Sequence, residues 1–265
     1  MIVGVCSDKG VPGVTTLATV LGLVWPAAVV LEADPAGGDL TFRLRNRQMP
    51  AQEFLPADPS VFQLAADARS GLLADGQVVR YAQETTLGVR VVPGPLQAEQ
   101  FAALRPLWPV LAQELAASPQ VVIVDLGRMQ PGHPAWAMAQ AATVLLVLGR
   151  PDPEGLCHLR ERVAQLAGDL GGGTRARNPV GAVIRTSAKR ARRSLDEAAL
   201  MLQAAGSPIP VLGWMGEDPA AVAALRAARV SRSLRSSDLT GSVQALAEVL
   251  TRLWPELAGQ ASGAA

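Results

Sequence analysis

The first candidate for chemistry is the segment "DKGVPGVTT", which begins at Asp8 between an apolar run and a helical pattern. A phosphate-binding loop reads G-x-x-x-x-G-K-[ST]: backbone N–H groups surround the phosphates, the lysine neutralises them, and the hydroxyl binds Mg²⁺. This segment supplies the turn through Gly10 and Gly13 and the hydroxyl through Thr15. It has Asp8 in place of the first glycine and Val14 in place of the lysine. The spacing therefore predicts the shape of a phosphate loop without its cation.

Carboxylates follow two other apolar runs. Glu32 and Asp34 end "VVLEAD", and Asp125 ends "VVIVD". Parallel strands have their carboxyl ends at one edge of a sheet, where ligands bind, so we expect Asp34 and Asp125 to converge on the loop. Glu32 and Asp34 could instead be ordinary solvated loop residues, whereas an acid that closes a continuous apolar strand favours the ligand edge.

The elements that would position these groups are short apolar runs separated by helical patterns. Continuous apolar character is typical of parallel strands buried on both faces, and the alternation predicts a doubly wound, mainly parallel α/β sheet of seven or eight strands with helices on both faces. Three stripes with helical spacing begin at Leu17, Leu156 and Val243. The predicted strands are Ile2–Cys6, Ala28–Leu31, Val89–Val92, Val121–Asp125, Thr143–Leu148, Gly181–Ile184 and Pro210–Trp214.

We expect one domain over residues 1–255 and a flexible tail over 256–265. Residues 38–86 contain several prolines and are predicted to form a helical excursion after the second strand. Ser194 and Glu197 have the spacing of a capping box, which predicts a helix start at that point.

Composition excludes several classes of protein. A net charge of +1 gives no global attraction to nucleic acid or membrane, and no apolar stretch approaches the length of about 18 residues that a spanning helix needs. The cysteines, Cys6 and Cys157, and the histidines, His133 and His158, match no metal or redox spacing. The chain is expected to be cytosolic, and to reach membrane or nucleoid only through a partner.

The motif "KGVPGVTT" resembles the deviant Walker A sequence K-G-G-x-G-K-[ST]-[ST] of the ParA/MinD family of partition and positioning ATPases. The resemblance places Lys9 on the family's signature lysine and Thr15 and Thr16 on its paired hydroxyls. It implies a P-loop NTPase-like fold, with ATP and Mg²⁺ as cofactors. Gly10, Gly13, Lys9, Thr15 and Thr16 would then bind the nucleotide.

Further motifs occur in the family's order over residues 1–255. "VVLEADPAGGDL" is similar to D-x-D-P-x-G-x-L, with Asp34 at the second acid and Glu32 at the first. "VVIVDLG" is similar to the Walker B strand, and "PIPVLGWMGEDPAAVAAL" to a run near the C-terminal end. The resemblance implies catalytic roles for Asp34 and Asp125 and a metal site made by Thr15 and Asp125.

The departures from the family pattern concern the nucleotide. Val14 removes the Walker lysine, and Val11 replaces a glycine that lets the backbone approach phosphate. Asp8 places a carboxylate beside the anion site, and Arg185 stands where the family has an asparagine that contacts adenine. A charge-assisted hydrogen bond contributes about 1.5–3 kcal/mol, so loss of the lysine should weaken phosphate binding roughly ten- to a hundredfold. Gly127 comes too early after Asp125 for the family's switch glycine.

Two functions remain open at this point. One is a ParA/MinD-like switch that dimerises with ATP, its Lys9 reaching the partner's nucleotide, and resets by slow hydrolysis. The other is a scaffold without hydrolysis that localises a larger machine, like the CpaE/TadZ proteins of tight-adherence pili. An active ParA-type ATPase of DNA or plasmid partition and a metabolic ligase of related fold are the alternatives.

A basic run occupies residues 175–193 and contains no acidic residue. Its charge could be an ordinary solvated surface or a site of sequence-independent contact with the DNA backbone, and no groove-reading or aromatic pattern accompanies it. The cations of this run are Arg175, Arg177, Arg185, Lys189, Arg190, Arg192 and Arg193.

Overall fold

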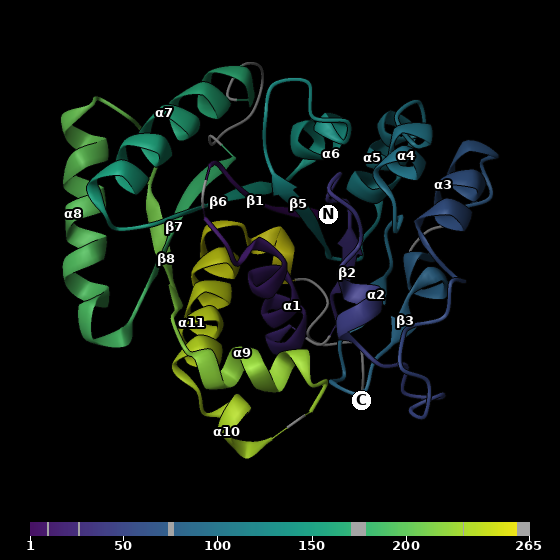
Figure 1. Ribbon diagram of the computed structural model, residues 1–265. Helices are drawn as coiled ribbons and strands as arrows, with labels where there is room; N and C mark the ends of the chain where they lie inside the picture. Colours follow the sequence, from purple (N-terminus) through teal and green to yellow (C-terminus); the bar gives the residue numbers. More distant parts are fainter. Residues whose placement is uncertain (10, 26, 74–76, 171–178, 230, 259–265) are drawn as a thin grey trace.

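A computed structural model describes residues 1–265 except 10, 26, 74–76, 171–178, 230 and 259–265. Its centre is an eight-stranded sheet with the order β3-β4-β2-β5-β1-β6-β7-β8 (Figure 1). Neighbouring strands are parallel, except that β3 is antiparallel to β4 at one edge. The strands are β1 Ile2–Ser7, β2 Val29–Glu32, β3 Gln83–Glu84, β4 Arg90–Val92, β5 Val122–Arg128, β6 Val144–Gly149, β7 Val180–Thr186 and β8 Val211–Gly216.

The seven predicted strands are confirmed, and β3 is an addition to them. β3 has only two residues, both polar, and therefore lacks the apolar run by which a strand is recognised in sequence. Its place is set by pairing with β4, as Gln83 lies opposite Val91 in the antiparallel ladder.

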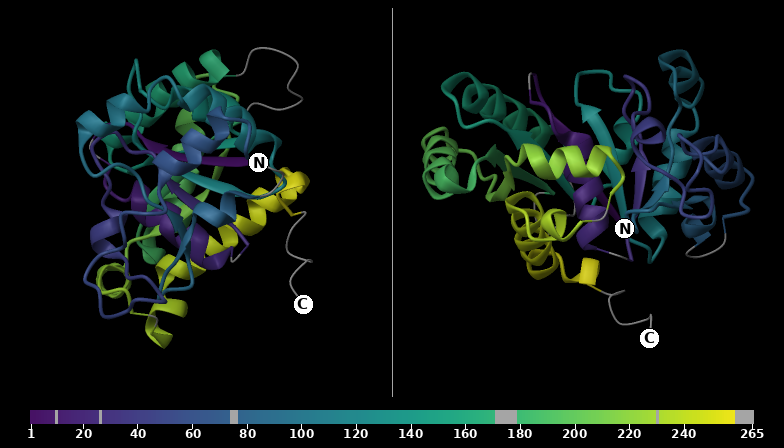
Figure 2. Two further views of the ribbon diagram at one scale, coloured as in Figure 1. Left: turned by 90° about the vertical axis from the view of Figure 1, so that its right-hand side faces the viewer. Right: turned by 60° about the horizontal axis from the view of Figure 1, so that its bottom comes forward.

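Two apolar clusters cover opposite faces of the sheet, and Figure 2 shows the helical layers on either side. Side chains alternate between the faces, since Ile2 and Cys6 enter one cluster and Val3 and Val5 enter the other. The first face is covered by α3 Val61–Arg69, α4 Ala98–Ala103, α5 Trp108–Ala117, α6 Trp136–Ala141, α7 Pro153–Leu170 and α8 Ala191–Ala204. The second is covered by α1 Val14–Val24, α2 Leu40–Arg43, α9 Pro219–Arg226, α10 Arg232–Arg235 and α11 Asp238–Leu253.

The predicted helical stripes lie on the longer helices of these layers. Leu17 on α1, Leu159 on α7 and Val243 on α11 each belong to a row of buried side chains. The excursion after β2 contains α2, α3 and a 3-10 turn, Gln77–Tyr81, before β3.

The predicted capping box at Ser194 is wrong. α8 begins three residues earlier, at Ala191, and Ser194 is buried inside it with its hydroxyl 3.1 Å from that of Thr186. Glu197 pairs instead with Arg193. A serine with a partner on a neighbouring strand has no need to cap its own helix.

The end of the described chain is a 3-10 turn, Pro255–Ala258. Leu257 lies within the predicted tail but is buried in the second cluster. No helix in the described ranges combines the length and the apolar character that crossing a bilayer requires.

Candidate functional site

The phosphate-type loop connects β1 to α1. β1 is a central strand with β5 on one side and β6 on the other, so the loop lies at the carboxyl edge of the sheet. Gly13 is the N-cap of α1 with φ of 122°, a conformation that residues with a Cβ rarely adopt. Its carbonyl accepts the first helical hydrogen bond, from Leu17 N at 2.8 Å. Lys9 is exposed in the turn, and Gly10 lies outside the described residues.

The loop is apolar on the side that faces the core. Val11 and Val14 are only 8% and 6% exposed and belong to the cluster around α1. Met215 of β8 lies over Gly13: its methyl carbon is 2.7 Å from the place a Cβ on Gly13 would take. The position at which a P-loop has its lysine is therefore occupied by hydrocarbon.

Asp8 does not face the loop as an unpaired anion. Arg162 of α7 donates to its Oδ1 from Nε at 3.0 Å and from an Nη at 2.7 Å, and both side chains are 13% exposed. His158 Nδ1 is 3.7 Å from the other oxygen. The Asp8 carboxylate is therefore neutralised by Arg162 and should oppose a bound anion less than its place in the sequence indicates. Arg162 is 154 residues away in the chain, and no local pattern could have indicated it.

Asp125 is fully buried on β5, opposite Val5 of β1 and Glu32 of β2. Its Oδ1 accepts from Gly127 N at 3.0 Å, and its Oδ2 has no hydrogen-bond partner among the described residues. Burial raises the pKa of Asp125 to about 7; the Thr15 hydroxyl opposes this rise, and the charges of Glu32 and Asp34 add to it. A buried carboxylate oxygen without a donor is suited to a cation.

Asp34 lies against the turn that follows Asp125. A Cβ on Gly127, whose φ is 58°, would be 2.2 Å from the Asp34 carboxyl carbon, so only glycine fits there. The Asp34 Oδ1 accepts from Ala36 N at 2.9 Å. Burial raises the pKa of Asp34, although the Ala36 N–H works against the rise. The structure therefore brings Asp34 and Asp125 to the same edge as the loop.

Glu32 has a structural role. Its two carboxylate oxygens accept from Leu40 N at 2.9 Å and Gly94 N at 3.1 Å, and the residue is 2% exposed. Burial raises the pKa of Glu32, and these backbone donors limit the increase. The solvated-loop interpretation is excluded, because Glu32 instead ties together two segments that follow β2 and β4.

A groove of about 270 Å³ runs beside the loop from Pro12 and Gly13 to the segment after β8. Arg185 of β7 lines it, donating to the Pro12 carbonyl at 3.3 Å and lying 3.4 Å from a Glu217 carboxylate oxygen. Thr16 and Arg226 also line this groove. Arg185 is consequently held where a ligand in the groove would meet it.

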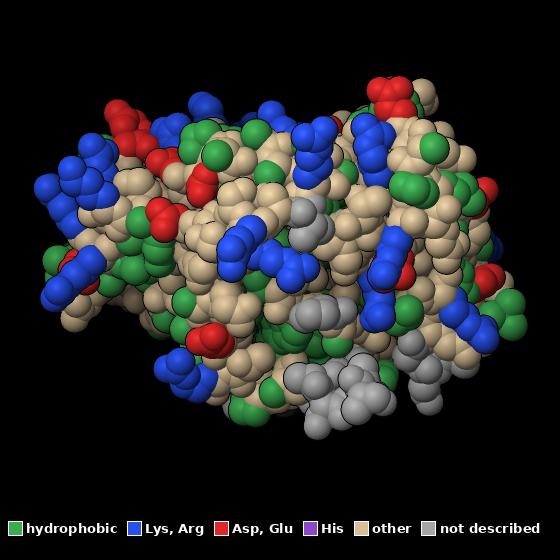
Figure 3. Space-filling view, turned by 90° about the horizontal axis from the view of Figure 1, so that it is seen from below, with side chains coloured by type: hydrophobic (Ala, Val, Ile, Leu, Met, Phe, Trp, Pro, Cys, Tyr) green, Lys and Arg blue, Asp and Glu red, His purple; other side chains and the backbone are tan. Residues whose placement is uncertain are grey.

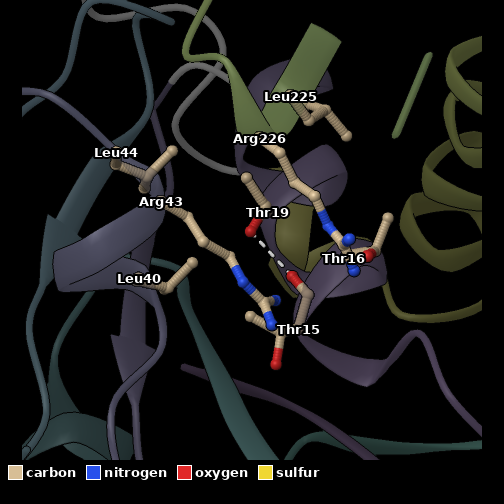
Figure 4. Close-up of a pocket in the computed structure, with 8 residues that line it drawn as sticks. All are labelled: Thr15, Thr16, Thr19, Leu40, Arg43, Leu44, Leu225 and Arg226. Carbon is tan, nitrogen blue, oxygen red and sulfur yellow. Dashed lines mark hydrogen bonds between the residues drawn. The ribbon is translucent and has the colours of Figure 1, made fainter. Parts of the chain in front are cut away.

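A smaller pocket adjoins the groove at the same Thr16 and Arg226, and Figure 4 shows its lining side chains. Thr15 and Thr19 come from α1, and the Thr19 hydroxyl donates to the Thr15 carbonyl at 2.7 Å. Arg43 of α2 and Arg226 of α9 extend toward the first turn of α1 from opposite sides. The sequence did not place either arginine at this site, because neither belongs to a phosphate-binding motif.

The basic run lies partly at another surface. Figure 3 shows Lys and Arg side chains gathered at the left edge of the molecule, over α8. Lys189, Arg190, Arg192 and Arg193 are exposed there, and Arg193 pairs with Glu197. Arg175 and Arg177 lie outside the described residues. Arg185 belongs to the groove, so the run does not form one continuous patch.

Comparisons with known proteins identify relatives by structure alone. No protein-family model matches the chain. No curated protein matches it either. A ParA family ATPase from Chlorobium tepidum TLS superposes with a TM-score of 0.68 at 16% identity, covering 94% of this chain and 97% of that one. The cell division ATPase MinD of Pyrococcus furiosus gives 0.68 at 18% identity, with 95% and 98% covered. The septum site-determining protein MinD of Pyrococcus horikoshii, complexed with Mg-ADP, gives 0.68 at 16%, with 96% of each covered.

The chain has the ParA/MinD fold. At 16–18% identity the similarity concerns the fold, and it covers nearly the whole chain. In this chain, the loop between β1 and α1 lies near the carboxyl edge of the sheet together with Asp34, which follows β2, and Asp125, which lies within β5. Among the residues that the structure describes, no three His, Cys, Asp or Glu side chains form a ready metal site. A metal here would depend on hydroxyl and water ligands as well as Asp125.

Replacement of Asp125 by Asn should flatten the dependence of stability on pH. Between the ordinary carboxyl pKa of 3.8 and the folded value of about 7, the folded chain keeps a proton that the unfolded chain has lost. The free energy of unfolding should therefore fall as pH rises through this window, and less steeply in Asp125→Asn. Urea unfolding across this pH range measures the slope. Asp196→Asn, an exposed change on α8, is the matched control; equal slopes in all three proteins would contradict the prediction.

Arg162→Ala should lower the free energy of unfolding by about 1–3 kcal/mol, because it leaves the poorly exposed Asp8 carboxylate without its charged donors. Arg193→Ala is the control, since its pair with Glu197 is exposed and should contribute no measurable stability. Chemical denaturation of both variants gives the comparison. Equal stability of wild type and Arg162→Ala would show that the ion pair does not hold the loop.

Proposed function

We propose that this chain is a nucleotide-linked positioning or partition factor, acting as a dimerising scaffold with weakened or absent ATP hydrolysis. The observation that carries the proposal is a contrast between two residues of the same site, Val14 at the loop and Asp125 on β5. Val14 is packed into the apolar core where a P-loop has its lysine, whereas Asp125 retains a buried oxygen without a donor near Thr15. The loop keeps the backbone shape that would bind phosphates, but it has no lysine at position 14.

The residues of the site are suited to binding Mg²⁺ and a nucleotide, and are less suited to hydrolysing it. Thr15 and Asp125 would bind the metal, directly or through water, and the unpartnered Asp125 oxygen supports that assignment. Backbone N–H groups at Gly13 and the first turn of α1 would face the phosphates, with Thr16 beside them. Bound Mg²⁺ would supply charge neutralisation at the phosphates.

Hydrolysis depends more on the missing lysine than binding does. In phosphoryl transfer the protein contributes positioning and stabilisation of charge that develops on the transferred group. Asp34 would orient an attacking water, but without a cation at Val14 the developing charge lacks its usual partner. Binding can persist through backbone and metal, so we assign the chain a switch or scaffold role with slow or no turnover.

The nucleotide would lie in the groove that Arg185 lines, with its phosphates at the loop. The Pyrococcus horikoshii MinD of the same fold is complexed with Mg-ADP, which supports a nucleotide as the ligand class. A homodimer with Lys9 reaching the partner's nucleotide, and a protein partner in a larger machine such as a pilus or secretion apparatus, complete the proposal. The exposed cations at the start of α8 and just before it support non-specific DNA contact as a secondary role in partition.

Turnover and binding test this function together. We expect wild type to bind Mg-ADP weakly in calorimetry and to release phosphate from ATP very slowly or not at all. Val14→Lys should strengthen binding about tenfold, since an ammonium can then meet the phosphates. Val14→Met is the control, because it has similar length and no charge.

Equal affinities of the lysine and methionine variants would show that charge at this position is irrelevant. Turnover by wild type as fast as that of an intact ParA ATPase measured alongside would overturn the scaffold assignment. If wild type and both variants bind no nucleotide, the assignment of a nucleotide as the ligand is wrong.

Dimerisation should require nucleotide and Lys9. Sedimentation velocity with Mg-ATPγS should show a dimer for wild type and a weaker one for Lys9→Ala, because the exposed ammonium would lose the partner's phosphates. Lys189→Ala removes the other lysine of the chain and is expected to dimerise as wild type does. A monomer under all conditions, or equal effects of both changes, would contradict this role of Lys9.

A further inference from the structure

Two arginines from distant parts of the chain converge on the start of α1. Arg43 lies on α2 and Arg226 at the end of α9, and both line the small pocket with Thr15 and Thr16 (Figure 4). In that view the guanidinium of Arg43 lies toward Thr15 and that of Arg226 toward Thr16. Arg226 also lines the groove beside the loop, so it marks the junction of the two spaces.

Arg43 and Arg226 have few partners among the described residues. Arg226 has neither an ion pair nor a hydrogen bond with any residue that the structure describes. Arg43 pairs with Asp39, four residues before it, but their side chains are 32% and 56% exposed. An exposed pair of this kind contributes little free energy, so Arg43 can exchange its partner at small cost.

The surroundings add positive potential to these two cations. The N-terminus of α1 has a partial positive charge from its unpaired N–H groups, and its first turn contains no acidic residue. Next to it, near Thr15, the buried Asp125 oxygen without a donor among the described residues is suited to a cation. A metal-bound phosphate chain would satisfy both features at once, since it presents anionic oxygens to the arginines and a cation to the carboxylate.

The inner side of the loop cannot supply this charge. Val11 and Val14 are buried, and Met215 covers Gly13. A further cation from this chain could therefore reach the phosphates from the outer side of α1, where Arg43 and Arg226 lie. The space they enclose is about 20 Å³, room for one water, so the two side chains must open outward to admit a phosphate.

We propose that Arg226, assisted by Arg43, binds the phosphate chain of a nucleoside di- or triphosphate and supplies positive charge for binding that the missing lysine at Val14 does not. This inference rests on the proposed function, because it assigns the cations of the same nucleotide site. A guanidinium presents a planar fork of donors that pairs with two phosphate oxygens, whereas a lysine offers a point charge. Arg226→Lys should therefore keep only part of the binding.

The test separates phosphate binding from nucleotide binding by using two probes, inorganic tripolyphosphate and Mg-ADP, in calorimetry. Wild type should bind both, and Arg226→Ala should bind each about ten- to a hundredfold more weakly, the loss expected for charge-assisted hydrogen bonds. Arg43→Ala should show a smaller loss of the same kind. Arg192→Ala, an exposed arginine on α8 without an ion pair to any described residue, is the matched control and should bind as wild type does.

Each outcome bears on one of the two proposals. If Arg226→Ala loses tripolyphosphate binding and Arg192→Ala does not, the arginine site is supported. Failure of wild type to bind Mg-ADP would overturn the nucleotide function only. Unchanged binding of both probes in Arg226→Ala overturns the arginine site and leaves the nucleotide function intact. A wild type that binds no tripolyphosphate, or equal losses in Arg226→Ala and Arg192→Ala, also overturns the arginine site. The three arginines are exposed or half-buried, so each variant is expected to fold. Circular dichroism of each variant checks this.

Discussion

The arrangement of the site depends on the burial of the Asp125 carboxylate. It lies within the central strand β5. One of its oxygens accepts from the backbone N–H of Gly127, and the other has no donor among the described residues. Burying a charged group without a partner is unfavourable, and the raised pKa expresses that penalty as retention of a proton. A cation at this oxygen would remove the penalty, which is why the carboxylate indicates a ligand more strongly than any exposed acid.

The neighbouring acids have separate tasks that follow from their partners. Glu32, directly opposite Asp125 in the sheet, uses both oxygens to tie the segments after β2 and β4. Asp34 retains an accessible carboxylate and fits against Gly127, where no side chain could be accommodated. Three carboxylates at one sheet edge would repel one another if all were ionised, so their crowding also raises the pKa of Asp125.

The loop has Val14 where a phosphate-binding loop has its lysine, and contacts within the chain hold its shape. Val11, Val14 and Met215 fill the inner side with hydrocarbon and stabilise the turn by burial. On the other side, Arg162 neutralises Asp8 and joins the loop to α7. The shape of the loop therefore depends on contacts within the chain, and no bound phosphate is needed to explain it. This separation of shape from charge supports the proposed role as a scaffold or switch.

The sequence by itself determined the layers of the fold and the edge at which the acids meet. Continuous apolar runs specify parallel strands, and parallel strands necessarily end at a common edge, so the positions of Asp34 and Asp125 followed from pattern alone. The loop was recognisable because its glycine and hydroxyl spacing is local. Tertiary structure decided the rest: the pairing of Asp8 with Arg162, the contact of Met215 with Gly13, and the approach of Arg43 and Arg226 to α1. These contacts join residues far apart in the chain, and only the packing of the helices on the sheet brings them within reach of one another.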